Sequence, residues 1–235
     1  MVEITNLYKK FGKNEVLNGI NLSIQAGGIF AVLGPNGSGK TTIIKTILGM
    51  VIPEKGSIKV FDTDVKNNSA YRHKIDYLPQ IANFPSNLKV SELIKMIKDL
   101  RGHTNADLNL IEKFKLQPFL NKKLGTLSGG TKQKVNIVLT FMFNSPIIIL
   151  DEPTTGLDPI SLIRLKDLID AEKAKGKTII ITSHIMSFVE EVADEIVFIL
   201  EGKIYFKGSI AELKAKTNQQ DFEHAIANIL TENHA

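Results

Sequence analysis

Short, strongly apolar runs alternate with longer mixed segments in the second half of the chain. The runs 147–150, 178–182 and 195–200 are dominated by Ile, Leu, Val and Phe, and their lengths fit β-strands. The segments between them, 160–174 and 186–193, are predicted as helices. Strands without a polar face that are joined by helices predict a parallel sheet covered on both sides, which is an α/β fold.

The first third of the chain predicts mainly strands. Glycine residues mark the turns between these strands. We expect strands at 2–8, 19–25, 29–33, 57–61 and 75–78, and one helix at 40–48. We therefore expect an antiparallel β-sheet region before the α/β core.

The middle of the chain predicts helices. Val90, Leu93, Ile94 and Ile97 fall at i, i+3, i+4 and i+7, which places one apolar stripe along a helix. We expect the other helices at 106–116, from 129 to about 144, and twice beyond 209, after a hairpin strand at 203–207.

These elements fit a single domain of 235 residues. We expect a core with an antiparallel β-subdomain at 1–83 and 145–208, a helical subdomain at 84–144, and C-terminal helices at 209–235.

Composition narrows the class of protein. The chain has no cysteine, which excludes disulfides and thiolate metal sites and fits a reducing compartment. Apolar runs such as 147–150 are far shorter than the roughly 20 residues of a membrane-spanning helix, and the first residues lack a signal-peptide pattern. We therefore expect a soluble chain. The net charge of +4 is spread along the sequence, so no nucleic-acid partner is expected.

A glycine-rich segment carries the strongest chemical signal. Gly-Pro-Asn-Gly-Ser-Gly-Lys-Thr at 34–41 fits G-x-x-x-x-G-K-[ST] between a predicted strand and a predicted helix. Its glycines let backbone N–H groups converge on phosphate oxygens at a helix N-terminus. Lys40 is expected to reach the outer phosphates, and the Thr41 hydroxyl to ligate Mg²⁺. The segment predicts a nucleoside triphosphatase.

An acidic pair follows the most apolar strand. Asp151 and Glu152 come directly after 147–150, and the carboxyl ends of parallel strands are where α/β folds bind ligands. Asp151 is expected to hold Mg²⁺, and Glu152 to polarise the attacking water. On its own, an acidic pair at a strand end also fits a simple exit to solvent.

A second segment predicts another anion-binding helix N-terminus. Ser128 can cap the helix that follows, and Gly129 and Gly130 leave backbone N–H groups exposed at its positive end. A plain helix cap is the alternative. Two such segments in one chain make sense if the second completes the phosphate loop of another copy.

The ordered set of motifs resembles the nucleotide-binding subunit of ATP-binding-cassette (ABC) transporters over nearly the whole chain. Segments 34–41, 147–152 and 127–131 resemble the Walker A, Walker B and signature motifs. Gln80 resembles the Q-loop glutamine, Asp158 lies in a segment that resembles the D-loop, and His184 resembles the switch histidine. The resemblance implies a P-loop NTPase fold with a RecA-like parallel-sheet core, an N-terminal antiparallel β-subdomain and an inserted α-helical subdomain.

The resemblance also implies residue roles. Catalytic roles fall to Glu152, His184 and Gln80, and Mg²⁺ ligation to Thr41, Gln80 and Asp151. The residues implied to bind ATP are Phe11 on adenine, Gly34, Pro35, Asn36, Gly37, Ser38, Gly39, Lys40, Thr41, Thr42, Ser128, Gly129, Gly130 and Asp158.

The same resemblance implies the binding partners of the chain and its location in the cell. A second copy is expected to form a head-to-tail homodimer around two Mg-ATP. A separate transmembrane subunit is expected to dock between Gln80 and Asn87, which would hold the chain at the inner face of the cell membrane. One departure stands out, because Thr131 occupies the position where the family signature usually has Gln.

The sequence is compatible with several alternatives. Segment 129–136 is similar to the ATPase that serves copper-site maturation of nitrous-oxide reductase. A second hypothesis is that the chain is a soluble ABC ATPase of an iron–sulfur assembly complex. Members of the family that act on DNA or ribosomes carry long coiled coils or two cassettes, and neither is found in this sequence. A GTP switch would need an acidic residue where 121–124 ends in Leu124. A non-hydrolysing module would lack Glu152 or His184.

Overall fold

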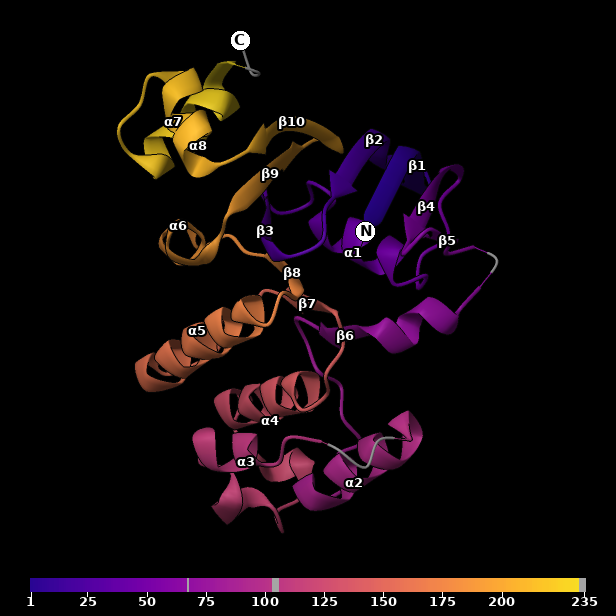
Figure 1. Ribbon diagram of the computed structural model, residues 1–235, viewed down its shortest axis with the longest axis vertical. Helices are drawn as coiled ribbons and strands as arrows, with labels where there is room; N and C mark the ends of the chain where they lie inside the picture. Colours follow the sequence, from indigo (N-terminus) through magenta and orange to yellow (C-terminus); the bar gives the residue numbers. More distant parts are fainter. Residues whose placement is uncertain (67, 103–105, 233–235) are drawn as a thin grey trace.

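The computed structural model describes residues 1–66, 68–102 and 106–232, which form two β-sheets with helices packed on them (Figure 1). Residues 103–105 of the predicted helical subdomain and 233–235 of the predicted C-terminal segment lie outside the described residues.

The larger sheet has six strands and forms the centre of the molecule. From edge to edge its strands are β10 (Lys203–Gly208), β9 (Glu195–Leu200), β3 (Gly28–Leu33), β8 (Thr178–Thr182), β7 (Ile147–Asp151) and β6 (Ile75–Leu78). All neighbours pair in parallel except β10, which pairs antiparallel with β9. The predicted parallel sheet is confirmed.

The smaller sheet is antiparallel and comes from the N-terminal part of the chain. Its strands, in spatial order, are β2 (Asn14–Ile24), β1 (Val2–Phe11), β4 (Lys55–Val60) and β5 (Thr63–Asp64). The first two strands are longer than the predicted segments 2–8 and 19–25. The pairing continues through Lys10 with Glu15 and Phe11 with Asn14, because exposed polar side chains do not interrupt the backbone ladder of a hairpin.

Helices cover both faces of the larger sheet. Around the core lie α1 (Lys40–Ile47), the 3₁₀ turn η1 (Ala70–Lys74), α5 (Pro159–Ala174), α6 (Met186–Val192), α7 (Ile210–Thr217) and α8 (Phe222–Glu232). A helical region at one end of the molecule holds α2 (Val90–Arg101), α3 (Asn109–Lys113), the short turns η2 (Gln117–Phe119) and η3 (Leu124–Thr126), and α4 (Gly129–Phe141) (Figure 1).

The predicted helix at 106–116 is wrong in its length. Before α3, the Asp107 carboxylate accepts a hydrogen bond from the Asn109 backbone N–H at 3.0 Å, and this local turn competes with a helical start. Beyond the helix, Lys115 has a left-handed φ of 53°, which ends the regular backbone. Only Asn109–Lys113 is therefore α-helical.

The core is divided by the larger sheet into two apolar clusters. In β7, Ile147 and Ile149 face the cluster that contains α1 and the smaller sheet, while Ile148 and Leu150 face the cluster that contains α4, α5 and α6. Because every side chain of β7 is buried, the strand cannot shift its register without exposing apolar surface. Its carboxyl end is thus held in a fixed position. Within the described residues, no helix combines the length and apolar character needed to cross a membrane.

Candidate active site at the carboxyl edge of the sheet

Four neighbouring parallel strands deliver the predicted site residues to one edge of the sheet. Strands β3, β8, β7 and β6 are consecutive. The glycine-rich loop, His184, the acidic pair and Gln80 lie at the carboxyl ends of these strands or in the segments that follow them. Residues from distant parts of the sequence therefore meet because of strand order.

The glycine-rich loop folds tightly between β3 and α1. A Cβ atom on Gly34 would lie 2.1 Å from the Ile199 carbonyl oxygen, and one on Gly39 would lie 2.8 Å from the Val16 carbonyl oxygen. Gly37 differs, because it has a φ of 83° and no atom within 4 Å of its Cβ position. The loop thus packs against the protein at its two ends and faces open space in its middle.

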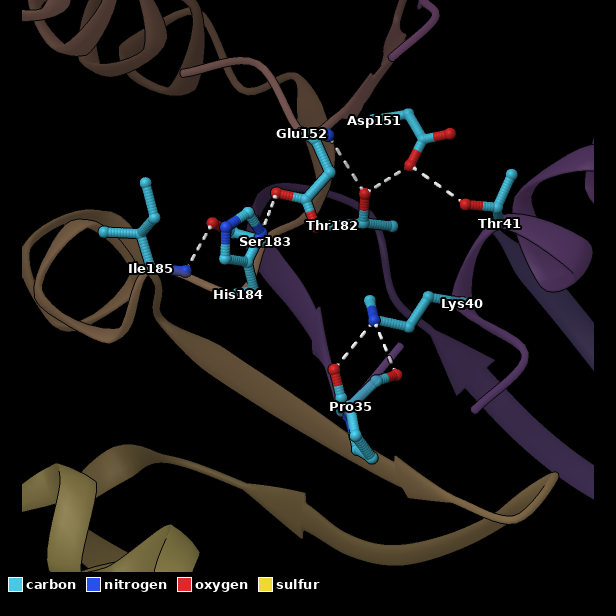
Figure 2. Close-up of polar contacts among 10 residues, drawn as sticks. Pro35, Lys40, Thr41, Asp151, Glu152, Thr182, Ser183, His184 and Ile185 are labelled. Carbon is cyan, nitrogen blue, oxygen red and sulfur yellow. Dashed lines mark hydrogen bonds and ion pairs between the residues drawn. The ribbon is translucent and has the colours of Figure 1, made fainter. Parts of the chain in front are cut away.

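Lys40 lies inside this loop. Its Nζ donates hydrogen bonds to the Gly34 carbonyl at 2.7 Å and the Pro35 carbonyl at 3.0 Å (Figure 2). Burial lowers the pKa of Lys40, and the nearby Glu152 and Asp151 carboxylates oppose that shift. The hydroxyl of Ser38 is buried and has no hydrogen-bond partner. A partly desolvated cation and an unsatisfied hydroxyl beside a glycine loop fit a polyphosphate.

Asp151 is buried at the end of β7. Its Oδ1 accepts hydrogen bonds from the Thr182 hydroxyl and, at 3.4 Å, from the Thr41 hydroxyl (Figure 2). Burial raises the pKa of Tyr77, and the Asp151 carboxylate raises it further. A carboxylate and a hydroxyl that converge are oxygen ligands of the kind Mg²⁺ prefers.

Glu152 adopts an unusual backbone conformation. Its φ is 50°, a left-handed value that is costly for a residue with a Cβ atom. The Glu152 N–H donates to both the carbonyl and the hydroxyl oxygen of Thr182, each at 3.1 Å. In this conformation the Glu152 carboxylate reaches His184, and its Oε2 lies 2.8 Å from Nδ1 of the imidazole (Figure 2). The His184 side chain is 62% exposed, whereas that of Glu152 is 7% exposed.

Lys40, Thr41 and Glu152 line an open cavity of about 350 Å³, whereas Asp151 and His184 do not line it. The residues that line it are Phe11, Asn14, Val16, Asn36, Gly37, Gly39, Lys40, Thr41, Thr42, Gln80 and Glu152. Of the other predicted residues, Gly34, Pro35 and Ser38 belong to the loop itself. Phe11 is 52% exposed at the rim, and the Lys9 Nζ lies 5.1 Å from the centre of its ring.

The Ser128 segment does not line this cavity in the described structure. Ser128 caps α4, and its hydroxyl accepts the Thr131 backbone N–H at 3.3 Å. Gly130 packs against the loop between β7 and α5. A Cβ atom on Gly130 would lie 2.6 Å from the Gly156 carbonyl oxygen. Within one chain, Ser128 and Gly129 are therefore exposed and lie outside the cavity at the glycine-rich loop.

Asp158 also lies outside the cavity. Its carboxylate caps α5 by accepting hydrogen bonds from the N–H and hydroxyl of Ser161, at 2.8 and 3.0 Å. Lys134 of α4 pairs with it at 2.7 Å. The hydrogen bond from Lys134 is the main reason that the pKa of Asp158 is well below its usual range.

Two residues of this site were not anticipated from the sequence. Thr182 joins Asp151 to the Glu152 backbone, and Tyr77 lies beside Asp151. Thr182 ends a predicted strand, but only the parallel register that places it beside Asp151 reveals its contact. A pairing register between distant strands is not readable from a single sequence.

Sequence comparison assigns most of the chain to one profile. A profile described as "ABC transporter" matches residues 17–155, which is more than half of the chain. A shorter match, to "AAA domain, putative AbiEii toxin, Type IV TA system", covers 121–190 and does not include the phosphate loop.

Named relatives match over most of their lengths. The lantibiotic transport ATP-binding protein SrtF of Streptococcus pyogenes is 38% identical over 205 residues, which are 87% of this chain and 89% of that protein. The bacitracin transport ATP-binding protein BcrA of Bacillus licheniformis is 32% identical over 232 residues, which are 97% of this chain and 76% of that protein.

Solved structures match the fold closely. An ATP-binding subunit of an ABC transporter has a TM-score of 0.92 at 26% identity, and the match covers 98% of this chain and 99% of that one. A dimeric ATP-binding cassette in a post-hydrolysis state with ADP and Pi has a TM-score of 0.80 at 25% identity, and covers 89% of this chain and 98% of that one.

Proposed function

The chain belongs to the ABC transporter family, and from this premise we propose that two copies of it pack head to tail and share two ATP sites between them. As a member of that family, it is an ATP-binding cassette with ATPase activity. One observation carries the proposal: the Ser128 segment is exposed and does not line the cavity formed by the phosphate loop of its own chain. A second copy can bring this segment to that cavity. The dimeric state of the similar ADP-bound cassette supports this arrangement.

In each shared site, this chain's residues bind and orient the substrate ATP. Phe11 offers an exposed aromatic ring to adenine at the rim of the cavity. The 34–42 loop offers backbone N–H groups to the phosphates. Lys40 exchanges its bonds to the Gly34 and Pro35 carbonyls for phosphate oxygens. Ser128, Gly129 and Gly130 of the opposite copy add donors to the outer phosphate.

The residues around Asp151 fit one Mg²⁺ ion. Thr41 and Asp151 supply converging oxygens, and Gln80 lies on the same cavity. No group of three or more His, Cys, Asp or Glu side chains in the described part of the chain could hold a metal by itself. This fits Mg²⁺, which commonly binds through one or two carboxylates together with substrate phosphates. When bound, it would neutralise charge on the phosphates.

Glu152 is placed to activate the attacking water. Its carboxylate reaches the cavity, and His184 fixes it through the 2.8 Å contact. We assign Glu152 the role of orienting the water and accepting its proton, and His184 the role of positioning Glu152 and contacting the outer phosphate.

Glu152→Gln tests this arrangement. The variant keeps the shape of the side chain and removes the proton acceptor, so it should bind ATP, stop turning over and accumulate as a dimer. Light scattering after size exclusion, with ATP and with ADP, measures the mass. Lys40→Ala, which loses phosphate binding, serves as the matched control and should stay monomeric. A Glu152→Gln protein that remains monomeric with ATP would contradict the proposal.

A surface beside Gln80 supports docking of a separate membrane subunit between Gln80 and Asn87. A groove of about 480 Å³ lies there, bordered by Pro79 and Phe84 of the loop and by Ile97 and Leu139 of the helical region. Ile81, on the same loop, is 72% exposed. An apolar groove next to a nucleotide-sensing residue can transmit a change in the site. Such docking would place the chain at the inner face of the cell membrane.

The docking can be tested with the purified transporter. Ile81→Glu should weaken co-purification with the membrane subunit and leave ATP turnover of the free cassette intact. Leu108→Glu, at another exposed apolar residue, is the matched control and should not affect co-purification. Equal recovery of the complex with both variants would rule out this surface.

The transported cargo is the last part of the proposal. The relatives named for lantibiotic and bacitracin transport support transport of such antibiotics by this chain's transporter.

These names also favour a role in a transporter over a role as an iron–sulfur assembly ATPase. Copper-site maturation of nitrous-oxide reductase remains the second hypothesis, and rests on the resemblance of segment 129–136. A deletion strain separates the two. Raised sensitivity to lantibiotic or bacitracin supports the first, and loss of nitrous-oxide reductase activity with unchanged sensitivity supports the second.

A further inference from the structure

Two hydroxyl groups meet at the N-terminus of α4. The hydroxyl oxygen of Ser128 lies 2.9 Å from that of Thr131, and it also accepts the Thr131 backbone N–H at 3.3 Å. Ser128 is exposed, and nothing lies within 4 Å of the Cβ position of the next residue, Gly129. The pair therefore stands at an open surface, where a second molecule can approach.

The contact with Thr131 limits how the Ser128 hydroxyl can form hydrogen bonds. A serine hydroxyl has one proton to donate and two lone pairs that accept. The Thr131 N–H occupies one lone pair of Ser128. If the Thr131 hydroxyl donates to the other, both lone pairs are occupied and the Ser128 proton remains free to donate to a molecule at the open surface. Because threonine is β-branched, few χ1 rotamers are open to it, and in the rotamer present its hydroxyl lies beside that of Ser128.

We propose that Thr131 is a positioning residue that turns the Ser128 hydroxyl into an outward-directed donor for a phosphate oxygen of the ATP held by the second copy. This inference rests on the proposed function, in which Ser128 acts on the opposite site. A donor that is oriented before the reaction needs no reorganisation when charge develops on the phosphate. The side chain at 131 thus contributes to turnover without touching the nucleotide.

Three substitutions at this position separate orientation from packing. Thr131→Val keeps the branched shape and removes the hydroxyl, and it should lower kcat about five- to tenfold, the effect of one neutral hydrogen bond. Its KM for ATP should change far less, because the phosphate loop of each copy is untouched. Thr131→Ser restores the hydroxyl and should recover most of the kcat. Thr131→Gln replaces the hydroxyl with an amide donor on a longer side chain and should recover only part of the kcat that the valine variant loses.

A double-mutant cycle tests whether Thr131 acts through Ser128. In a Ser128→Ala background, which keeps the backbone donors, Thr131→Val should cause no further loss of kcat. Wild-type kcat in Thr131→Val would overturn the inference. An equal loss in both backgrounds would also overturn it, because the effect would then be independent of the Ser128 hydroxyl.

The failure of the inference can be told apart from failure of the proposed function. Ser128→Arg places a bulky cation in the segment that enters the opposite site, and it should abolish turnover. If Ser128→Arg is inactive and Thr131→Val behaves like wild type, only the role of Thr131 is wrong. If Ser128→Arg turns over normally, the shared site is wrong, and the inference falls with it.

Discussion

Glu152 and His184 are joined by a 2.8 Å contact between Oε2 and Nδ1, although they lie 32 positions apart in the chain. Both residues follow the carboxyl ends of neighbouring parallel strands, β7 and β8. The exposed imidazole therefore holds a nearly buried carboxylate at the wall of the phosphate cavity.

Removal of His184 should impair chemistry more than binding. Without the imidazole, the Glu152 carboxylate is free to rotate away from the water, and a displacement of this kind costs about a hundredfold in rate. We expect His184→Ala to lower kcat by roughly that factor while ATP binding, measured by fluorescence titration, stays near normal. His224→Ala breaks a similar exposed contact with Asp221 far along the chain and should leave kcat unchanged. If both variants kept wild-type kcat, the positioning role of His184 would be wrong.

The backbone at Glu152 should be measurably strained. A φ of 50° costs a residue with a Cβ atom roughly 1 kcal/mol or more. Glu152→Gly and Glu152→Ala both lose the carboxylate and its contact with His184, so their difference isolates the backbone. The greater freedom of glycine in the unfolded chain offsets part of the gain. We expect the glycine variant to have the larger free energy of unfolding, by about 0.5 kcal/mol, in urea titrations. A more stable alanine variant would contradict the left-handed conformation.

The ion pair between Lys134 and Asp158 should make stability depend on pH. The pKa of Asp158 is lower in the folded protein than in the unfolded chain, mainly because of Lys134. Its contribution to stability is therefore present above the ordinary carboxyl pKa of about 4 and is lost as the pH falls through the lowered folded value. Asp158→Asn retains a helix cap and removes the charge.

The free energy of unfolding should consequently differ most between wild type and Asp158→Asn near neutral pH. We expect a difference below about 1 kcal/mol, because the pair is partly exposed, and it should shrink below pH 4. Lys134→Met removes the partner cation and should show the same trend. A difference that is equal at pH 3 and pH 7 would exclude the ion pair as its source.

The sequence predicted most of the fold because its signals are local. The apolar runs of β7, β8 and β9 and the glycine spacing before α1 are each contained within a few residues, and these elements were placed correctly. The ends of β1 and β2 were misplaced, because Lys9 and Lys10 are polar and the hairpin continues through them. The predicted helix at 106–116 was too long, because an Asx-type turn at Asp107 shortens it.

The site was less predictable than the fold, because its contacts cross between strands. Glycine spacing locates the phosphate loop and an acidic pair locates the end of β7, but the bond from Thr182 to Asp151 depends on the register of β7 with β8. The left-handed turn at Glu152 has no signal in a side chain that normally avoids it. The contact between the Ser128 and Thr131 hydroxyls could be recognised only from the geometry of the N-terminus of α4.

Mixing two inactive variants tests the shared site most directly. Ser128→Arg keeps an intact phosphate loop, and Lys40→Ala keeps an intact Ser128 segment, so each should have almost no ATPase activity alone. In a mixed dimer, one site combines the intact halves. A 1:1 mixture should then recover turnover, because each mixed dimer has one intact site of its two, and the recovery would be roughly a quarter of wild type if all pairings were equally frequent. No recovery in the mixture, with both variants folded and mixed dimers present, would contradict a site formed by two copies.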